Sequence, residues 1–122
     1  MKATDVIIYT DMDGTALTDW SLGPVVPERN LARIRAFVSA GGLFSVASGR
    51  QAPGILQLFP GVAFHAPLVC GNGSVIYDPA EQQVLRKTCL PPDYKCACVS
   101  YFLTHPEVWI VAADETRIWQ IV

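Results

Sequence analysis

The chain has 122 residues, which is enough for one modest domain that buries roughly two-thirds of its unfolded surface. Hydrophobic residues make up 51% of the sequence and charged residues 16%, which excludes an intrinsically disordered protein because disorder needs the opposite balance. The formal net charge of −2 provides no basic surface for nucleic acid or for an anionic membrane. We therefore expect neither of these partners.

The apolar segments of the sequence are too short for a membrane helix. The longest of them, at 6–9, 43–47 and 108–113, fall far short of the roughly 20 residues that a spanning helix needs. The first apolar run lies between Asp5 and Asp11 and is unlike a signal peptide. We therefore expect a cytoplasmic protein whose four cysteines are small buried side chains rather than disulfides or zinc ligands.

The first part of the chain alternates β-rich runs with helical patterns, which is typical of βαβ units and a parallel sheet. Three apolar runs predict strands: 6–10, 43–47 and 67–70. Apolar residues at helical spacing predict a helix that begins at Pro27 and ends before Gly41, and a shorter helix over 51–59. The sequence therefore predicts an α/β fold.

The pattern changes after the third strand. Two β-rich runs, 74–77 and 84–88, predict an antiparallel hairpin around a turn at Asp78. A helix is predicted to begin near Pro92. Two final strands are predicted on either side of a turn at 114–115, over 108–112 and 117–122.

A polar loop that contains glycine follows each of the three parallel strands, at the edge where open α/β sheets bind their ligands. These loops are Asp11-Met12-Asp13-Gly14-Thr15, Ser48-Gly49-Arg50 and Gly71-Asn72-Gly73. Because the three loops follow three apolar strands in order, they should converge at one end of the sheet. This convergence is the main indication of a functional site.

The residue types in these loops suit a bound anion. Residues two apart at a strand end point the same way, so Asp11 and Asp13 can flank one point. Gly14 allows a sharp turn and a close approach of the backbone. Ser48 places a hydroxyl and exposed N–H groups at the start of a helix, which is a place where anions bind.

Each loop also has an ordinary structural interpretation. An EF-hand is excluded, because its sixth and twelfth positions need Gly and Glu where this chain has Ala16 and Leu22. A plain acidic turn remains open for the first loop, and common turn chemistry remains open for the other two. For Arg50, a solvated position at a helix start is the alternative to a role in binding.

Together the loops resemble the haloacid dehalogenase (HAD) superfamily of phosphatases, and more narrowly the Cof-type sugar-phosphate phosphatases. The resemblance is carried by the segments 11–15, 46–50 and 70–78, which read DMDGT, VASGR and CGNGSVIYD. It implies a partial Rossmann-like core with parallel strands, followed by the start of an α/β cap. Residues 1–77 would be the N-terminal half of the core, and residues 78–122 the beginning of the inserted cap.

The resemblance also implies a role for each loop residue. In that family the residue matching Asp11 attacks the substrate phosphorus and becomes an aspartyl phosphate. The residue matching Asp13 protonates the leaving alcohol and then helps to deprotonate the attacking water. Mg²⁺ is held by the Asp11 carboxylate and the Asp13 backbone carbonyl, together with the phosphate. The positions expected to bind phosphate or substrate are Gly14, Ser48, Gly49, Arg50 and Asn72.

Two parts of the family's pattern have no counterpart in these 122 residues. One is a lysine that steadies the nucleophile and the phosphate, for which Lys87 and Lys95 in the cap-like segment are poor substitutes. The other is a later acidic loop, Gly-Asp-x-x-Asn-Asp, that completes the Mg²⁺ coordination. Because the sequence also ends in an apolar, strand-like run at 118–122, we expect the chain to be a truncated form.

In the family the first strand is central in the sheet. Here residues 6–9 would instead form an open edge with apolar side chains on both faces, which invites pairing with another chain. We therefore expect the 122-residue chain to be a fragment, or to fold only by self-association through this edge.

The leading hypothesis is a Mg²⁺-dependent phosphomonoester hydrolase whose partner is a small-molecule phosphate ester, such as a sugar phosphate or a similar metabolite. A phosphosugar mutase with the same fold is one alternative, and the release of inorganic phosphate separates the two. A catalytically inert fragment or binding module is the other alternative, because the lysine and the second acidic metal ligand are missing.

Overall fold

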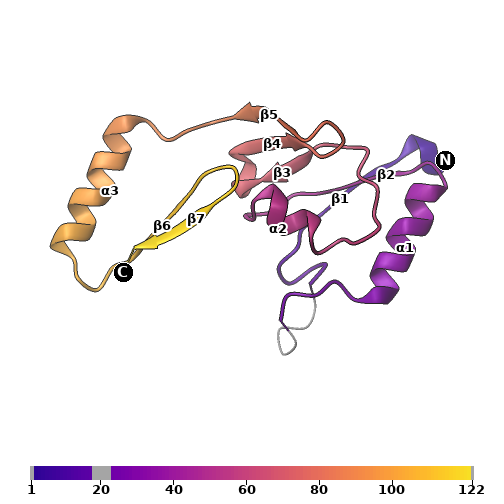
Figure 1. The fold of residues 1–122 in the computed structure, drawn as a ribbon, viewed down its shortest axis with the longest axis horizontal. Coiled ribbons are helices and arrows are strands. Elements are labelled where there is room, and N and C mark those ends of the chain that lie inside the picture. Colours follow the sequence, from indigo (N-terminus) through magenta and orange to yellow (C-terminus); the bar gives the residue numbers. More distant parts are fainter. Residues whose placement is uncertain (1, 18–22, 122) are drawn as a thin grey trace.

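The structure is a computed structural model that describes residues 2–17 and 23–121 (Figure 1). Its elements are, in chain order, the 3₁₀ turn η1 (Ala3–Asp5), β1 (Ile7–Thr10), α1 (Glu28–Ser39), β2 (Leu43–Val46), α2 (Ala52–Leu56), β3 (Leu68–Cys70), the 3₁₀ turn η2 (Gly71–Gly73), β4 (Val75–Asp78), β5 (Gln83–Lys87), α3 (Pro92–Thr104), β6 (Ile110–Ala113) and β7 (Ile118–Ile121). This order confirms the predicted α/β fold.

The first three strands are parallel to one another. β1 pairs with β2, with Ile7 opposite Leu43. A parallel bridge between Ala47 and Val69 continues the pairing from β2 to β3. β3, β4 and β5 form an antiparallel sheet in that order, and β6 and β7 form a separate hairpin. The predicted parallel strands and both predicted hairpins are therefore confirmed.

One face of the parallel strands carries the hydrophobic core. Phe44 and Val46 of β2 are buried there, together with Leu31 of α1. The Phe44 ring lies 5.8 Å from that of Phe59 and 6.0 Å from that of Phe64, so three aromatic side chains form one cluster. Aromatic pairs at these separations add about 0.5–1.5 kcal/mol each beyond the burial of their area. This packing fixes β2 in the middle of the core.

The opposite face of β1 and β2 is tied to the start of β3 by two hydroxyl groups. Ser45 is fully buried, and its hydroxyl donates a hydrogen bond to the Pro67 carbonyl oxygen at 2.7 Å. The Tyr9 hydroxyl donates to the same carbonyl oxygen at 3.0 Å. Tyr9 is the register partner of Ser45, so its side chain reaches past β2 to the residue before β3. These bonds hold the three strands together on this face.

Two sequence-based expectations are wrong in detail. The helix expected over 51–59 ends at Leu56, because the N–H groups of Leu58 and Phe59 donate three residues back in tight turns. The cysteines are not all buried, since only Cys70 is and the other three are exposed. Burial raises the pKa of the Cys70 thiol to about 11.

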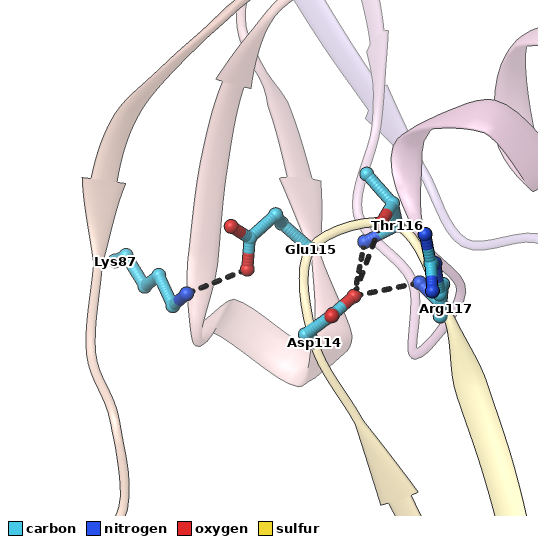
Figure 2. A network of polar contacts seen from close by, with 5 residues as sticks. All are labelled: Lys87, Asp114, Glu115, Thr116 and Arg117. Carbon is cyan, nitrogen blue, oxygen red and sulfur yellow. Dashed lines mark hydrogen bonds and ion pairs between the residues drawn. The ribbon is translucent and has the colours of Figure 1, made fainter.

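The segment after β5 lies largely apart from the core. α3 stands at the far end of the molecule in Figure 1, and none of its residues is buried. An ion pair joins this segment to β5. The Nζ of Lys87, at the end of β5, lies 2.6 Å from a carboxylate oxygen of Glu115 in the β6–β7 turn (Figure 2). No helix in the described part of the chain is long and apolar enough to cross a membrane.

The β6–β7 turn is the one that the sequence predicts at 114–115. The Asp114 carboxylate accepts hydrogen bonds from the backbone N–H groups of Thr116 and Arg117, each at 2.7 Å (Figure 2). Because these donors favour the ionised carboxylate, they hold the pKa of Asp114 below its usual value. Asp114 therefore acts as the turn residue, as expected for this position.

Within residues 2–17 and 23–121, β1 pairs along one edge alone, with β2. Its side chains are exposed on both faces of the sheet, Ile7 by 50% and Ile8 by 41%. An apolar strand with one free edge is a template for pairing with another chain.

We expect the purified chain to self-associate at micromolar concentration through β1. Ile7→Lys should shift it toward monomer, because a charge on the edge opposes strand pairing. Analytical ultracentrifugation measures the change, and Leu103→Lys, at an exposed position on α3, should leave the association unchanged. A monodisperse monomer of the unaltered chain with a cooperative thermal melt would contradict this expectation.

Candidate active site

The loop after β1 presents two carboxylates on its exposed side. Met12 is fully buried, whereas Asp11 and Asp13 on either side of it are exposed. The loop is held by a hydrogen bond of 2.8 Å from the Leu17 N–H to the Met12 carbonyl oxygen. Gly14 has a φ of +85°, a conformation that L residues rarely adopt. Both carboxylates therefore reach solvent, while Met12 between them belongs to the hydrophobic core.

The loops after β2 and β3 are joined by backbone hydrogen bonds. The Ser48 N–H donates to the Val69 carbonyl oxygen at 2.9 Å, and the Asn72 N–H donates to the Ser48 carbonyl oxygen at 3.1 Å. The Gly71 N–H donates to the Arg50 carbonyl oxygen, also at 3.1 Å. The predicted convergence of these two loops is therefore confirmed, and it rests on the backbone.

A cavity of about 290 Å³ opens where the three loops meet. It is lined by Asp11, Ala47, Ser48, Gly49, Val69, Asn72 and Gly73. Of the residues expected to act on a phosphate ester, Asp11, Ser48, Gly49 and Asn72 thus border one space, while Asp13, Gly14 and Arg50 lie outside its lining. A larger groove of about 380 Å³ lies between β1 and α1, and its lining is mostly apolar.

Asp13 and Arg50 are joined side chain to side chain. The Arg50 guanidinium donates from Nε to one carboxylate oxygen at 3.0 Å and from Nη2 to the other at 2.7 Å. These hydrogen bonds hold the pKa of Asp13 below its usual value and outweigh the opposing effect of partial burial. Arg50 therefore lies near the start of α2 with its guanidinium paired to Asp13 and partly exposed to solvent. The sequence places both residues after neighbouring strands, but it does not indicate this pairing.

Gly49 and Asn72 approach one another closely across the cavity wall. A Cβ at Gly49 would lie 3.0 Å from Oδ1 of Asn72, which is tighter than ordinary contact. Asn72 itself has a φ of +55°, a left-handed conformation that asparagine tolerates better than most residues. A side chain at position 49 would therefore require the Asn72 amide to move by a few tenths of an ångström.

The described residues offer few ligands for a metal ion. They contain no group of three His, Cys, Asp or Glu side chains that would hold one. The Asp11 carboxylate borders the cavity, and the exposed Asp13 adds a backbone carbonyl two residues later. Oxygen donors of this kind suit Mg²⁺, which usually keeps several waters and binds one or two carboxylates plus substrate phosphates. The donor set therefore fits part of a magnesium site.

The fold is that of an α/β protein whose glycine-bearing polar loops meet at the carboxyl edge of its parallel strands. A family model described as haloacid dehalogenase-like hydrolase matches residues 8–121. The chain therefore belongs to this family, which confirms the resemblance found in its loops.

One curated relative is 5-amino-6-(5-phospho-D-ribitylamino)uracil phosphatase YbjI of Escherichia coli strain K12, which is 30% identical over 115 residues. The match covers 94% of this chain and 41% of the relative, so the chain spans less than half the length of that protein.

Solved structures share the fold at lower sequence identity. BT1666 from Bacteroides thetaiotaomicron, a phosphatase of the HAD superfamily, matches with a TM-score of 0.74 at 16% identity, over 94% of this chain and 41% of its own. TM0651 from Thermotoga maritima matches with a TM-score of 0.68 at 24% identity, over the same shares of the two chains. These likenesses confirm the partial HAD-like α/β architecture.

Arg50→Met should raise the pKa of Asp13 toward its ordinary value, because the hydrogen bonds that favour the ionised carboxylate are lost. In the unaltered protein the pKa of Asp13 is lower in the folded chain than in the unfolded chain. The ionised carboxylate therefore stabilises the fold at pH values above the unfolded pKa. This stabilisation is lost as the pH falls through the folded pKa. Carboxyl ¹³C NMR titration measures the change. Arg33→Met, at an exposed position of α1, should leave the Asp13 pKa where it is; an unmoved pKa in Arg50→Met would contradict the prediction.

Gly49→Ala should displace Asn72 and destabilise the chain by about 1 kcal/mol or more, because the added methyl group overpacks the contact between the loops. Gly54→Ala is the matched control, since a Cβ there meets nothing within 4 Å in the helix α2. It should stabilise the chain by about 0.5–1 kcal/mol. Urea unfolding measures both changes, and equal effects of the two substitutions would refute the packing argument.

Proposed function

We propose that the protein is a phosphomonoester hydrolase of the Cof type, and that this chain supplies the nucleophile and the anion-binding loops. The proposal is supported above all by one arrangement, in which Asp11, Ser48 and Asn72 border a single cavity at the ends of neighbouring strands. An exposed carboxylate faces the same space there as a hydroxyl, a side-chain amide and glycine backbone. This combination suits attack on the phosphorus of a bound phosphate group.

The reaction takes place in two displacements. An Asp11 carboxylate oxygen attacks phosphorus, the P–O bond to the alcohol breaks, and the alcohol oxygen takes a proton from Asp13. A water molecule then attacks the aspartyl phosphate, Asp13 takes a proton from that water, and inorganic phosphate and free Asp11 are formed. The Ser48 hydroxyl and the N–H groups of its loop bind the phosphate oxygens throughout.

Magnesium would be held by the Asp11 carboxylate and the Asp13 backbone carbonyl, and when bound it would offset the repulsion between carboxylate and phosphate. The remaining ligands would be waters and phosphate oxygens, because the described residues provide no third carboxylate at the site.

The substrate class that we propose is a phosphorylated sugar or polyol. The name of the relative YbjI gives its substrate as a phosphoribitylamino-uracil, in which the phosphate sits on a polyol chain. The cavity of about 290 Å³ lies near the lower end of the roughly 300–1,000 Å³ of small-molecule sites, so it has room for the phosphate group and for part of the polyol chain.

The chain should release inorganic phosphate from a generic phosphomonoester in the presence of Mg²⁺, and Asp11→Asn should lower the rate by at least about 10³-fold, as loss of a covalent nucleophile does in other enzymes. A colorimetric phosphate assay measures the rate. Asp93→Asn, at an exposed position on α3, is the matched control and should keep full activity.

The same assay separates the proposal from its alternatives. A phosphosugar mutase would convert its substrate without releasing phosphate. Activity that survives in Asp11→Asn would exclude Asp11 as the nucleophile and overturn the proposal. The third outcome is an unaltered chain that is folded but inert. Such a chain would not bind Mg²⁺ below millimolar concentration and would release no phosphate.

A further inference from the structure

Arg50 is connected to all three loops of the candidate site. Its guanidinium donates two hydrogen bonds to Asp13 in the first loop, at 3.0 and 2.7 Å. Its backbone N–H donates to the Ser48 hydroxyl oxygen in its own loop at 3.3 Å. Its carbonyl oxygen accepts a hydrogen bond from the Gly71 N–H in the third loop at 3.1 Å. Both the backbone and the side chain of Arg50 are therefore fixed.

The cavity that suits the phosphate is bordered by other residues. Asp11, Ser48 and Asn72 line it, and neither Asp13 nor Arg50 does. Both members of the pair are partly exposed, with 28% of the Arg50 side chain and 39% of the Asp13 side chain accessible. The pair therefore lies beside the phosphate space rather than within it.

The form of the pair matters for what Arg50 can do. Two hydrogen bonds from one planar guanidinium to the two oxygens of one carboxylate fix both the position and the rotation of that carboxylate. The two N–H groups that bond Asp13 are not available to a phosphate group, and the other guanidinium N–H groups belong to a side chain that does not line the cavity. An ammonium group cannot replace this geometry, because it is a point charge on a flexible chain.

We propose that Arg50 is a positioning residue, which fixes the Asp13 carboxylate beside the cavity bordered by Asp11, Ser48 and Asn72 and does not itself bind the phosphate. This inference rests on the proposed function, in which Asp13 exchanges a proton with the alcohol and with water through one carboxylate oxygen. The hydrogen bond of that oxygen to Arg50 is given up at this step, while the other bond keeps the carboxyl group in place. It assigns to Arg50 a role different from the phosphate or substrate binding that the sequence suggests.

The kinetic test compares Arg50→Lys and Arg50→Ala with the unaltered chain. A positioning role predicts that kcat falls by about 10- to 100-fold while KM for a phosphomonoester changes by less than about 3-fold, with lysine restoring only a small part of kcat. Arg33→Ala, outside the site, is the control for a general loss of positive charge. A rise in KM at unchanged kcat would overturn the proposal, because it would make Arg50 a direct ligand of the substrate.

A second measurement does not depend on catalysis. The Nε–H proton of Arg50 should exchange slowly with solvent in a ¹⁵N NMR spectrum, and this protection should be lost in Asp13→Asn and kept in Asp11→Asn. The protection should persist in a titration with inorganic phosphate. The titration is continued until the NMR signals of Ser48 and Asn72 no longer change. Loss of the protection on adding phosphate would overturn the proposal, since the guanidinium would then have left Asp13.

The two measurements distinguish failure of this inference from failure of the proposed function. If the unaltered chain hydrolyses no phosphomonoester but Arg50 keeps its protection in the presence of phosphate, the proposed activity is wrong, while the pairing of Arg50 with Asp13 beside bound phosphate is supported. If the chain is active and the protection is absent in the unaltered protein, the activity stands and the inference about Arg50 is overturned.

Discussion

The backbone hydrogen bonds between the loops after β2 and β3 are the constraint on which the site depends. Ser48 uses both of its backbone groups, since its N–H donates to Val69 and its carbonyl oxygen accepts from Asn72. The parallel bridge between Ala47 and Val69 sets the register of these bonds. A shift of one residue in this register would turn the side chains of one loop to the opposite face of the sheet. The meeting of Ser48, Gly49 and Asn72 is thus decided by strand pairing.

Much of the arrangement could be predicted from the sequence, because it follows from local patterns. The run at 6–10 shows no alternation of apolar and polar residues before Thr10, which indicates a strand in a parallel sheet. Once the strands are parallel, the loops at their carboxyl ends must lie at one edge, so the convergence of Asp11, Ser48 and Asn72 follows from topology alone. The turn at Asp114 is equally local, since a single carboxylate and two nearby N–H groups form it.

The features that the sequence did not indicate depend on long-range contacts. Arg50 and Asp13 are 37 residues apart, and their pairing depends on side-chain conformations that no pattern encodes. The early end of α2 reflects the tight turns that lead from Leu56 to the buried Phe59, whose place in the aromatic cluster depends on contacts distant in the sequence. Cys96 and Cys98 are exposed because they lie on α3, none of whose residues is buried, and Cys89 is exposed in the segment between β5 and α3.

The isolation of α3 has a consequence for local unfolding and proteolysis. A helix of 13 residues with no buried side chain has little more than its intrinsic propensity to hold it, and helices of that length are marginal in water. It therefore opens at a small fraction of the free energy that unfolds the aromatic cluster around Phe44. We therefore expect trypsin to reach the bond after Lys95 through this local opening, whereas cleavage beside β2 should need the core itself to come apart.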